Sequence, residues 1–153
     1  MYRHYSIQGS MGGGSTSVSA ETALSLISTT TIRPYIYDFS FGSVGTPSDS
    51  LIVLSIPRLT NTTAGTGCTS SPPDALDHLD DPATSTAGMA YTAEPTIGVV
   101  LFQVGINVRA TYRWVASPGG ELVCPATAAA GLGIRSASPV YTLDASVTAF
   151  FAE

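Results

Sequence analysis

The chain has 153 residues, enough for one hydrophobic core and too few for two comfortable domains. Only 11% of the residues are charged, and because lysine is absent the six basic residues are all arginines, set against eleven acids for a net charge of −5. Nucleic-acid binding needs clustered basic residues and binding to anionic membranes needs exposed cations, so this composition argues against both.

Neither the apolar stretches nor the first residues direct the chain to a membrane. The most apolar run, Thr96 to Val104, is much shorter than the roughly 18 residues of a membrane-spanning helix. The N-terminal residues lack the charged start and the long apolar stretch of a secretory signal. We therefore expect the chain to act where it is made, or to leave the cell by another route such as lysis.

The N-terminal residues divide into an alternating segment and a glycine-rich segment. Tyr2 to Gln8 alternate enough to predict either a strand or an extended arm that adds to a neighbouring subunit. Gly9 to Ser17 contain three successive glycines, which are costly to order and offer no side chain to pack, as is typical of a linker. We therefore expect residues 1–20 to be an arm and linker, and residues 21–153 to form the single domain.

From Thr22 onward, short apolar runs rich in β-branched and aromatic residues alternate with Gly, Pro, Asn and Asp. This punctuation predicts an all-β protein, an antiparallel sandwich or barrel. The expected strands are Ala23–Ser28, Thr31–Phe41, Ser50–Leu59, Thr96–Val104, Ile106–Ala116, Glu121–Cys124, Gly131–Ala137 and Ala145–Phe151.

The strand expected at Thr31–Phe41 carries a row of aromatic residues. Residues two apart in a strand share a face, because successive side chains point to opposite sides. Pro34 cannot donate a ladder hydrogen bond and indicates an edge or a strand start. The face that we expect to be core or interface carries Tyr35, Tyr37, Phe39 and Phe41.

The strand expected at Ile106–Ala116 has one apolar and one polar face. The turn Ser117-Pro118-Gly119-Gly120 follows it, in which proline presets φ and glycine accepts the positive φ that comes next. We therefore predict an antiparallel hairpin between this strand and Glu121–Cys124. The apolar face carries Ile106, Val108, Ala110, Tyr112 and Trp114, and the polar face carries Asn107, Arg109, Thr111 and Arg113.

Residues 60–92 form a long polar segment, and loops of this length in a compact domain are usually functional or interfacial. Pro73 and the acids after it predict one short helical turn over Asp74 to Asp80. Several oxygen ligands in one loop suggest calcium, but their spacing differs from that of an EF-hand, so we favour a solvated acidic loop without a metal. The residues concerned are Asp74, Asp77, His78, Asp80 and Asp81.

The two cysteines, Cys68 and Cys124, lie far apart without a CxxC or histidine pattern, so a zinc site is not expected. A disulfide between them is arithmetically possible. We favour free thiols, because Cys68 falls in the long loop and Cys124 in an apolar strand, where a buried cysteine acts as a small hydrophobic residue.

No motif in the chain points to catalysis. The only histidines, His4 and His78, lack the setting of a nucleophile and base pair, and the glycines 12–14 lack the lysine and helix of a phosphate loop. A glycosidase-like carboxylate pair can be assembled from distant acids, so Glu94, Glu121 and Asp144 stay open as candidates. We expect no enzyme, no cofactor and no metal.

A set of six residues is a candidate for an interface. Arginine and tryptophan are enriched at interface hot spots, although Trp114 is equally compatible with the core and the arginines beside it with a solvated face. The tyrosines and the arginine of the N-terminal segment join them, since an arm would reach a neighbouring subunit. The set is Tyr2, Arg3, Tyr5, Arg109, Arg113 and Trp114.

The run EPTIGVVLFQVGINVRATYRWVASPGGELVCPATAAAGLGIRS, the stretch LIVLSIPRLT before the polar loop, and the ending AFFAE resemble small virion proteins of tailed bacteriophages. These look like capsid decoration (cement) or head-associated proteins. The resemblance implies a jelly-roll-like β-sandwich, a homotrimer on the capsid surface and contact with the major capsid protein. It carries no functional residue over to this chain.

Composition independently favours self-association, because edge strands and apolar faces in a chain of low charge need covering. The first hypothesis is a structural virion protein that stabilises the phage head. The second is a tail- or fibre-associated module that binds host polysaccharide, with Tyr35, Tyr37 and Trp114 as exposed stacking platforms. The third is a carbohydrate-active enzyme with two carboxylates converging in a cleft. Sandwiches host all three functions, so the fold alone does not choose.

Overall fold

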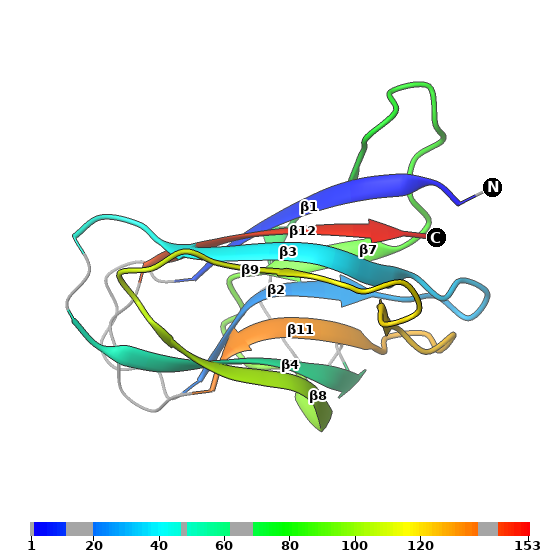
Figure 1. Cartoon of the computed structure of the whole chain (residues 1–153). Helices are drawn as coiled ribbons and strands as arrows, with labels where there is room; N and C mark the ends of the chain where they lie inside the picture. Colours follow the sequence, from blue (N-terminus) through cyan, green and yellow to red (C-terminus); the bar gives the residue numbers. More distant parts are fainter. Residues whose placement is uncertain (1, 12–19, 47–48, 62–68, 138–143) are drawn as a thin grey trace.

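Two antiparallel β-sheets pack face to face in the computed structural model, which describes residues 2–11, 20–46, 49–61, 69–137 and 144–153 (Figure 1). The described residues contain no helix, and so none that is long and apolar enough to cross a membrane. The two termini lie at the same end of the molecule, since the first and the last strand are neighbours. The prediction of an all-β sandwich is confirmed.

Sheet A has the strand order β10-β3-β12-β1-β6, with β9 also paired to β3. Its strands are β1 (His4–Met11), β3 (Tyr35–Ser43), β6 (Asp74–Ala75), β9 (Tyr112–Val115), β10 (Leu122–Val123) and β12 (Ala145–Ala152). Sheet B has the order β5-β7-β2-β11-β4-β8. Its strands are β2 (Glu21–Ile27), β4 (Leu51–Asn61), β5 (Thr69–Ser70), β7 (Thr86–Met89), β8 (Thr96–Asn107) and β11 (Gly131–Ser136).

The strand pairing is nested along the chain. β4 pairs with β8, β3 with β9 and β10, β2 with β11, and β1 with β12, all antiparallel. The chain is therefore one long hairpin whose successive pairs alternate between the two sheets, which is the connectivity of a jelly roll. This agrees with the jelly-roll-like sandwich that was expected.

Residue alternation decides which face of each strand is buried. In β12, Ala145, Val147, Ala149 and Phe151 are buried, whereas the residues between them, two hydroxyl residues and one phenylalanine, are exposed or half-buried. Phe151 stacks on Tyr5 of β1 with ring centroids 5.3 Å apart. Apolar side chains of both inner faces thus form one core, as expected for two sheets that exclude water between them.

A β-bulge in β3 changes the face on which its aromatic residues lie. Phe150 of β12 pairs with Asp38 while the next residue, Phe151, pairs with Ile36, so Tyr37 is the additional residue. Ile36, Phe39 and Phe41 are fully buried, whereas Tyr35 and Tyr37 are only half-buried. The prediction that Tyr35, Tyr37, Phe39 and Phe41 share one face is therefore wrong, because a bulge breaks the period of two.

The strands expected at Thr96–Val104 and Ile106–Ala116 are divided differently. β8 continues to Asn107, a turn follows in which the Ala110 N–H donates to the Asn107 carbonyl (3.0 Å), and β9 begins at Tyr112. The predicted single apolar face therefore ends at this turn, and Ala110 is exposed.

The predicted hairpin between the last two of these segments is wrong. The turn exists, with the Gly120 N–H donating to Ser117 and Gly119 at φ +80°. However, β9 and β10 do not pair with each other; each pairs antiparallel with β3, one after the other along the same edge. A turn signal is local, whereas the pairing partner is selected by the apolar face that β3 offers.

The N-terminal segment is a strand of sheet A. His4–Met11 forms β1, which pairs along its whole length with β12 and through Tyr5 and Ser6 with β6. Of the two alternatives expected for the N-terminal segment, a strand or an extended arm, the structure shows the strand, which also includes Gly9 to Met11 of the expected linker. The rest of the linker, residues 12–19, lies outside the described residues.

The long segment 60–92 contains three short strands instead of one continuous loop. β6 pairs with the outer edge of β1 in sheet A, and β7 pairs with the outer edge of β2 in sheet B. Instead of a helical turn, residues 74–80 form β6 and a turn in which the Asp80 N–H donates to the Asp77 carbonyl. One side of the sandwich is thus covered by this segment.

Candidate functional site: the free edge of β8

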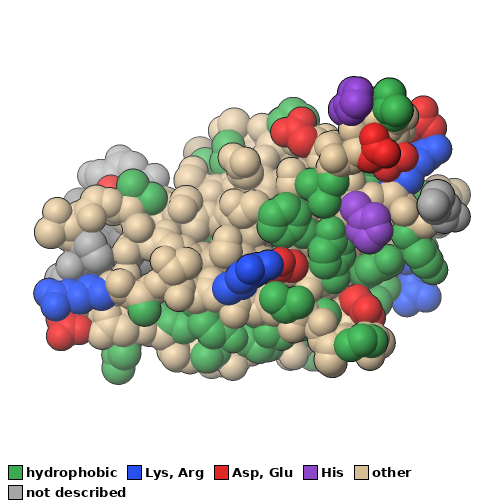
Figure 2. Space-filling model, turned by 45° about the horizontal axis from the view of Figure 1, so that its top comes forward, with side chains coloured by type: hydrophobic (Ala, Val, Ile, Leu, Met, Phe, Trp, Pro, Cys, Tyr) green, Lys and Arg blue, Asp and Glu red, His purple; other side chains and the backbone are tan. Residues whose placement is uncertain are grey.

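The most exposed apolar surface on a strand interior belongs to β8, the last strand of sheet B. It is 12 residues long and pairs on one side only, with β4. Ile97, Val99 and Val100 are 42%, 69% and 45% exposed. Figure 2 shows hydrophobic side chains along the lower margin of the molecule, the side on which β8 lies in Figure 1.

The β8 edge is uncharged, long and not covered by another described strand, although its pairing with β4 is regular only over residues 102–107 and shifts register over residues 96–101. Natural edges are shortened, charged, bulged or covered, because unpaired backbone groups otherwise pair with another chain. The segment Pro95 to Val108 contains no charged residue. On the opposite side of the sandwich, the terminal strands β5 and β6 have only two residues each. Within the described part of the chain, β8 is therefore the longest free edge.

Four aromatic rings close the sandwich beneath this edge. Phe39 of β3, Phe102 of β8 and Trp114 of β9 lie with ring centroids 5.5 to 6.2 Å apart, and Tyr112 joins them. Trp114 is half-buried and packs against the core. Its ring therefore packs β9 against β8. Of the two interpretations of Trp114, core residue or interface residue, the structure favours the core.

Arg113 and Arg109 have separate positions. Arg113 donates from Nε and a terminal nitrogen to both carboxylate oxygens of Asp38, at 3.1 and 2.5 Å. This pairing raises the pKa of Arg113, mainly through the hydrogen bond to Asp38. Arg109 lies in the exposed turn between β8 and β9, where its N–H donates to the Asn107 side chain. Arg113 thus serves its own sheet, whereas Arg109 stands at the end of the free edge.

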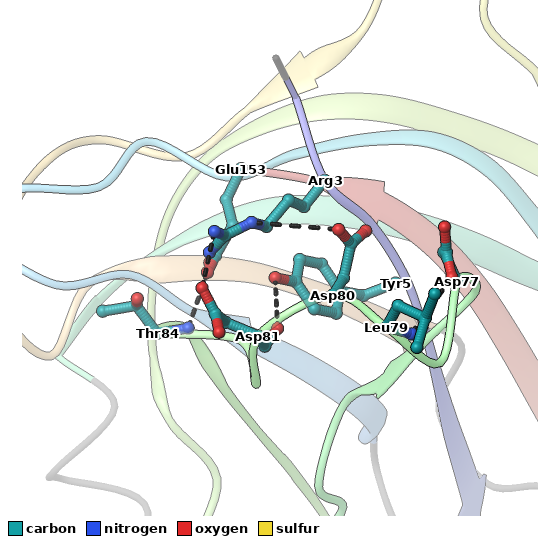
Figure 3. A network of polar contacts seen from close by, with 8 residues as sticks. All are labelled: Arg3, Tyr5, Asp77, Leu79, Asp80, Asp81, Thr84 and Glu153. Atoms are coloured by element: carbon teal, nitrogen blue, oxygen red, sulfur yellow. Dashed lines mark hydrogen bonds and ion pairs between the residues drawn. The ribbon is translucent and has the colours of Figure 1, made fainter.

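The N-terminal residues hold the acidic loop against the end of sheet A (Figure 3). Arg3 pairs with Asp81 at 2.6 Å and with Asp80 at 4.0 Å, and the Tyr5 hydroxyl donates to the Asp81 backbone oxygen at 3.0 Å. Coulombic attraction, chiefly to Asp81, raises the pKa of Arg3. Tyr5 is completely buried within its own chain, so it presents no surface to a partner. The prediction that Tyr5 is an interface residue is therefore wrong.

The side-chain carboxylate of the last residue, Glu153, also binds this loop. Glu153 accepts hydrogen bonds from the backbone N–H groups of Thr84 and Ser85, at 2.6 and 3.0 Å, and from the Ser85 hydroxyl. The loop between β6 and β7 is therefore fixed to both ends of the chain. Its turn carries Leu76 and Leu79, which are 53% and 81% exposed.

The acidic loop forms no metal cluster in the described residues. No group of three or more His, Cys, Asp or Glu side chains lies close enough there to hold an ion. Asp80 and Asp81 face Arg3, and the Asp77 side chain accepts the Leu79 N–H. Asp77, Asp80 and Asp81 thus each have a partner within the chain.

The three candidate catalytic carboxylates have different surroundings. Glu94, ahead of β8, accepts hydrogen bonds from the Thr22 N–H and hydroxyl, and Glu121 accepts the N–H of Gly119 within its turn. The Asp144 backbone oxygen accepts the Val44 N–H. Glu94 and Glu121 thus bind backbone groups of separate segments.

Of the two cysteines, the structure describes Cys124. Cys124 is fully buried and unbridged, with its sulfur 4.0 Å from the Leu26 carbonyl oxygen. Burial raises the pKa of its thiol to about 12. Cys68 lies outside the described residues.

The outer face of sheet A has an aromatic end. Tyr37 lies near His4 and Phe150, with ring centroids 5.4 and 6.5 Å apart, and Tyr35 meets Tyr2 edge-on at 5.5 Å. A shallow hollow of about 660 Å³ beside Tyr2 and Tyr35 is also lined by Arg33. Figure 2 views this face, on which hydrophobic side chains gather toward one end.

The position of β8 as an exposed edge strand was not predicted from the sequence, although the sequence contains an indication of it. Thr96 to Val104 was identified as the most apolar run, but a run of this type is equally compatible with a buried central strand. The additional signal is the absence of charge from Pro95 to Val108, bounded by Glu94 and Arg109. Exposure of the run depends on which strand ends the sheet.

Fold and surface together define a jelly-roll β-sandwich with one side covered by its own loop and one long edge left free. Scans against protein-family models, curated proteins and solved structures found no match for this chain.

Proposed function

We propose that the chain is a non-enzymatic structural protein of a tailed-bacteriophage virion, which decorates the capsid and stabilises it by binding the major capsid protein and further copies of itself. The free β8 edge is the observation that carries the self-association, because a long uncharged edge favours strand addition from another chain. The phage context comes from the resemblance of the sequence to decoration proteins.

The physical basis of such a function is added buried area, without chemistry. A protein that binds the assembled shell and not its separated subunits stabilises the shell by mass action. The low charge of the surface, with 11% charged residues in the chain, reduces the desolvation that contacts across a subunit seam require. Hydrogen bonds from Tyr5 and to Glu153 attach the loop that carries the 76–80 turn to both ends of the chain, so the turn is a preformed surface for binding to a shell.

The test compares phage particles that carry the protein with particles from which it has been removed. The stripped particles should rupture at lower temperature and lower osmotic stress, and adding the purified protein back should restore both values. Equal rupture temperatures with and without the protein would contradict a decoration function.

A second candidate is a tail- or fibre-associated module that binds host polysaccharide. It is favoured by the half-buried Tyr35 and Tyr37 on the outer face of sheet A, where aromatic rings accessible on one side can stack on sugars. Trp114, the third expected platform, packs on the other side of the sheet and does not join them. A glycan array with the protein and its Tyr35→Ala variant tests this candidate; binding that is lost in the variant would support it.

A further inference from the structure

We propose that two copies of the chain join their β8 edges antiparallel about a two-fold axis, so that the two copies of sheet B become one continuous sheet. This inference deepens the proposed function, on which its biological use rests, by naming the contact through which copies associate. An antiparallel pair of identical strands is self-complementary, as a two-fold interface requires.

The length of β8 favours the β8 edge of a second copy as its partner. Strand addition contributes hydrogen bonds in proportion to the regularly paired length, and residues 102–107 of β8, which pair with β4 without a register shift, gain most from another edge of at least this length. Among the described strands, β5 and β6 have two residues each, and the β3 edge is already occupied by β9 and β10. The long free edge that a second copy offers is therefore its own β8.

The charge pattern favours a second copy over an unrelated partner. The chain carries eleven acids and a net charge of −5, so most contacts between copies bring like charges together. Pro95 to Val108 has no charge, so two β8 edges meet without this repulsion. The exposed Ile97, Val99 and Val100 then cover apolar surface of the other copy.

The residues that bound β8 favour the antiparallel orientation. Glu94 precedes the strand and Arg109 follows it. Antiparallel overlap brings the Glu94 end of one copy to the Arg109 end of the other, whereas parallel overlap places acid beside acid and base beside base. The acids at both ends have partners in their own chain, since Glu94 accepts hydrogen bonds from Thr22 and Asp49 accepts one from the Asn107 side chain at 2.6 Å, so Glu94 acts on Arg109 of the other copy through its charge.

The first experiment measures native mass against concentration. The full chain should form a species of twice its 15.7 kDa mass. Val99→Lys should weaken the association at least about tenfold, because it places like charges in the contact. Leu79→Lys is the matched control, an apolar residue on the distant loop that is 81% exposed against 69% for Val99, and should leave the dimer unchanged. Unfolding curves of both variants verify that each is folded.

The second experiment tests orientation with a thiol-reactive cross-linker that spans about 10 Å, with the unsubstituted chain as reference. Gln103→Cys, near the middle of β8, should cross-link to its counterpart in the second copy, because antiparallel overlap places the two positions roughly 10 Å apart. Thr96→Cys should not, because antiparallel pairing separates the two copies of this residue by roughly 36 Å. Efficient cross-linking of both variants would show a parallel pair and overturn the proposal.

The outcomes separate this inference from the proposed function. A trimer, the state that the sequence resemblance implies, or a monomer at all concentrations would overturn the β8 pairing. A monomer would also remove the binding between copies from the proposed function, whereas stabilisation of the capsid is decided separately, by whether stripped particles rupture earlier. A dimer that Val99→Lys dissociates and Leu79→Lys preserves would support the pairing.

Discussion

The Tyr5 hydroxyl donates a hydrogen bond to the backbone oxygen of Asp81, 76 residues away along the chain, at 3.0 Å. The ring of Tyr5 is completely buried against Phe151, so this bond ties the acidic loop directly to the core. It places the loop beside Arg3, which pairs with the Asp81 carboxylate, and beside Glu153, which accepts a hydrogen bond from the Thr84 backbone N–H. The consequence is an exposed loop that is fixed at its base.

Tyr5→Phe removes this hydrogen bond and keeps the ring. The free energy of unfolding should fall by about 1 kcal/mol, the typical contribution of one hydrogen bond whose acceptor is left without its partner. Urea unfolding measures the change, and proteolysis within the loop should become faster. Tyr2→Phe, at a tyrosine that is 68% exposed, serves as the control. Identical urea midpoints for Tyr5→Phe and the unchanged protein would refute the anchoring role.

Gly131→Ala should be strongly destabilising. A Cβ atom at Gly131 would lie 2.0 Å from the Leu26 carbonyl oxygen, where β11 is paired on both sides. Backbone atoms cannot yield as a flexible side chain does, so the expected loss is about 1–3 kcal/mol or more. Gly105→Ala in β8 is the matched control, since a Cβ there meets nothing within 4 Å. Chemical denaturation of both variants should separate them clearly.

Alkaline pH should destabilise the protein through Cys124. Burial raises the pKa of this thiol from 9.0 to about 12, so the folded protein retains a proton that the unfolded chain releases. The stabilising contribution is complete below pH 9 and is lost as the pH rises from 9 to 12. Burial also raises the pKa of Tyr5, Tyr35 and Tyr37, which acts in the same direction.

The measurement is the urea midpoint from pH 7 upward for the unchanged protein and for Cys124→Ala. The variant should show a shallower decline above pH 9, with a residual slope from the tyrosines. Parallel declines of the two proteins would show that the thiol is not the titrating group.

Arg113→Ala should lower the urea midpoint, because it leaves the carboxylate of Asp38, a residue only 7% exposed, without its partner. A double-mutant cycle with Asp38→Asn isolates the pair, and the two changes should be clearly non-additive. Arg109→Ala is the control, since Arg109 forms no ion pair among the described residues. Additive effects of the two substitutions would contradict the coupling.

Local pattern was sufficient to predict most strands and the polar segment between β4 and β8. The period of two that places Ala145, Val147, Ala149 and Phe151 on one face is a local property, and the structure buries these four side chains. The turn at Ser117 to Gly120 is local too, and it is present. In each case the residues that determine the feature are adjacent in the chain.

Pairing partners required the tertiary structure. The bulge at Tyr37 and Asp38 arises where β3 meets β12, more than a hundred residues later, and it alone turns Tyr37 away from the face of Phe39. Arg113 meets Asp38 only because β9 lies along β3. No spacing within either segment carries this information.

Residue order and composition alone predict an all-β protein of low charge with an uncharged apolar run at Pro95 to Val108. That this run ends a sheet is seen only in the folded chain, in which the N-terminal segment is an inner strand and the described part of segment 60–92 covers the opposite side. The physical reason is that side-chain alternation is set residue by residue, whereas an edge exists only once every other strand has found its neighbours.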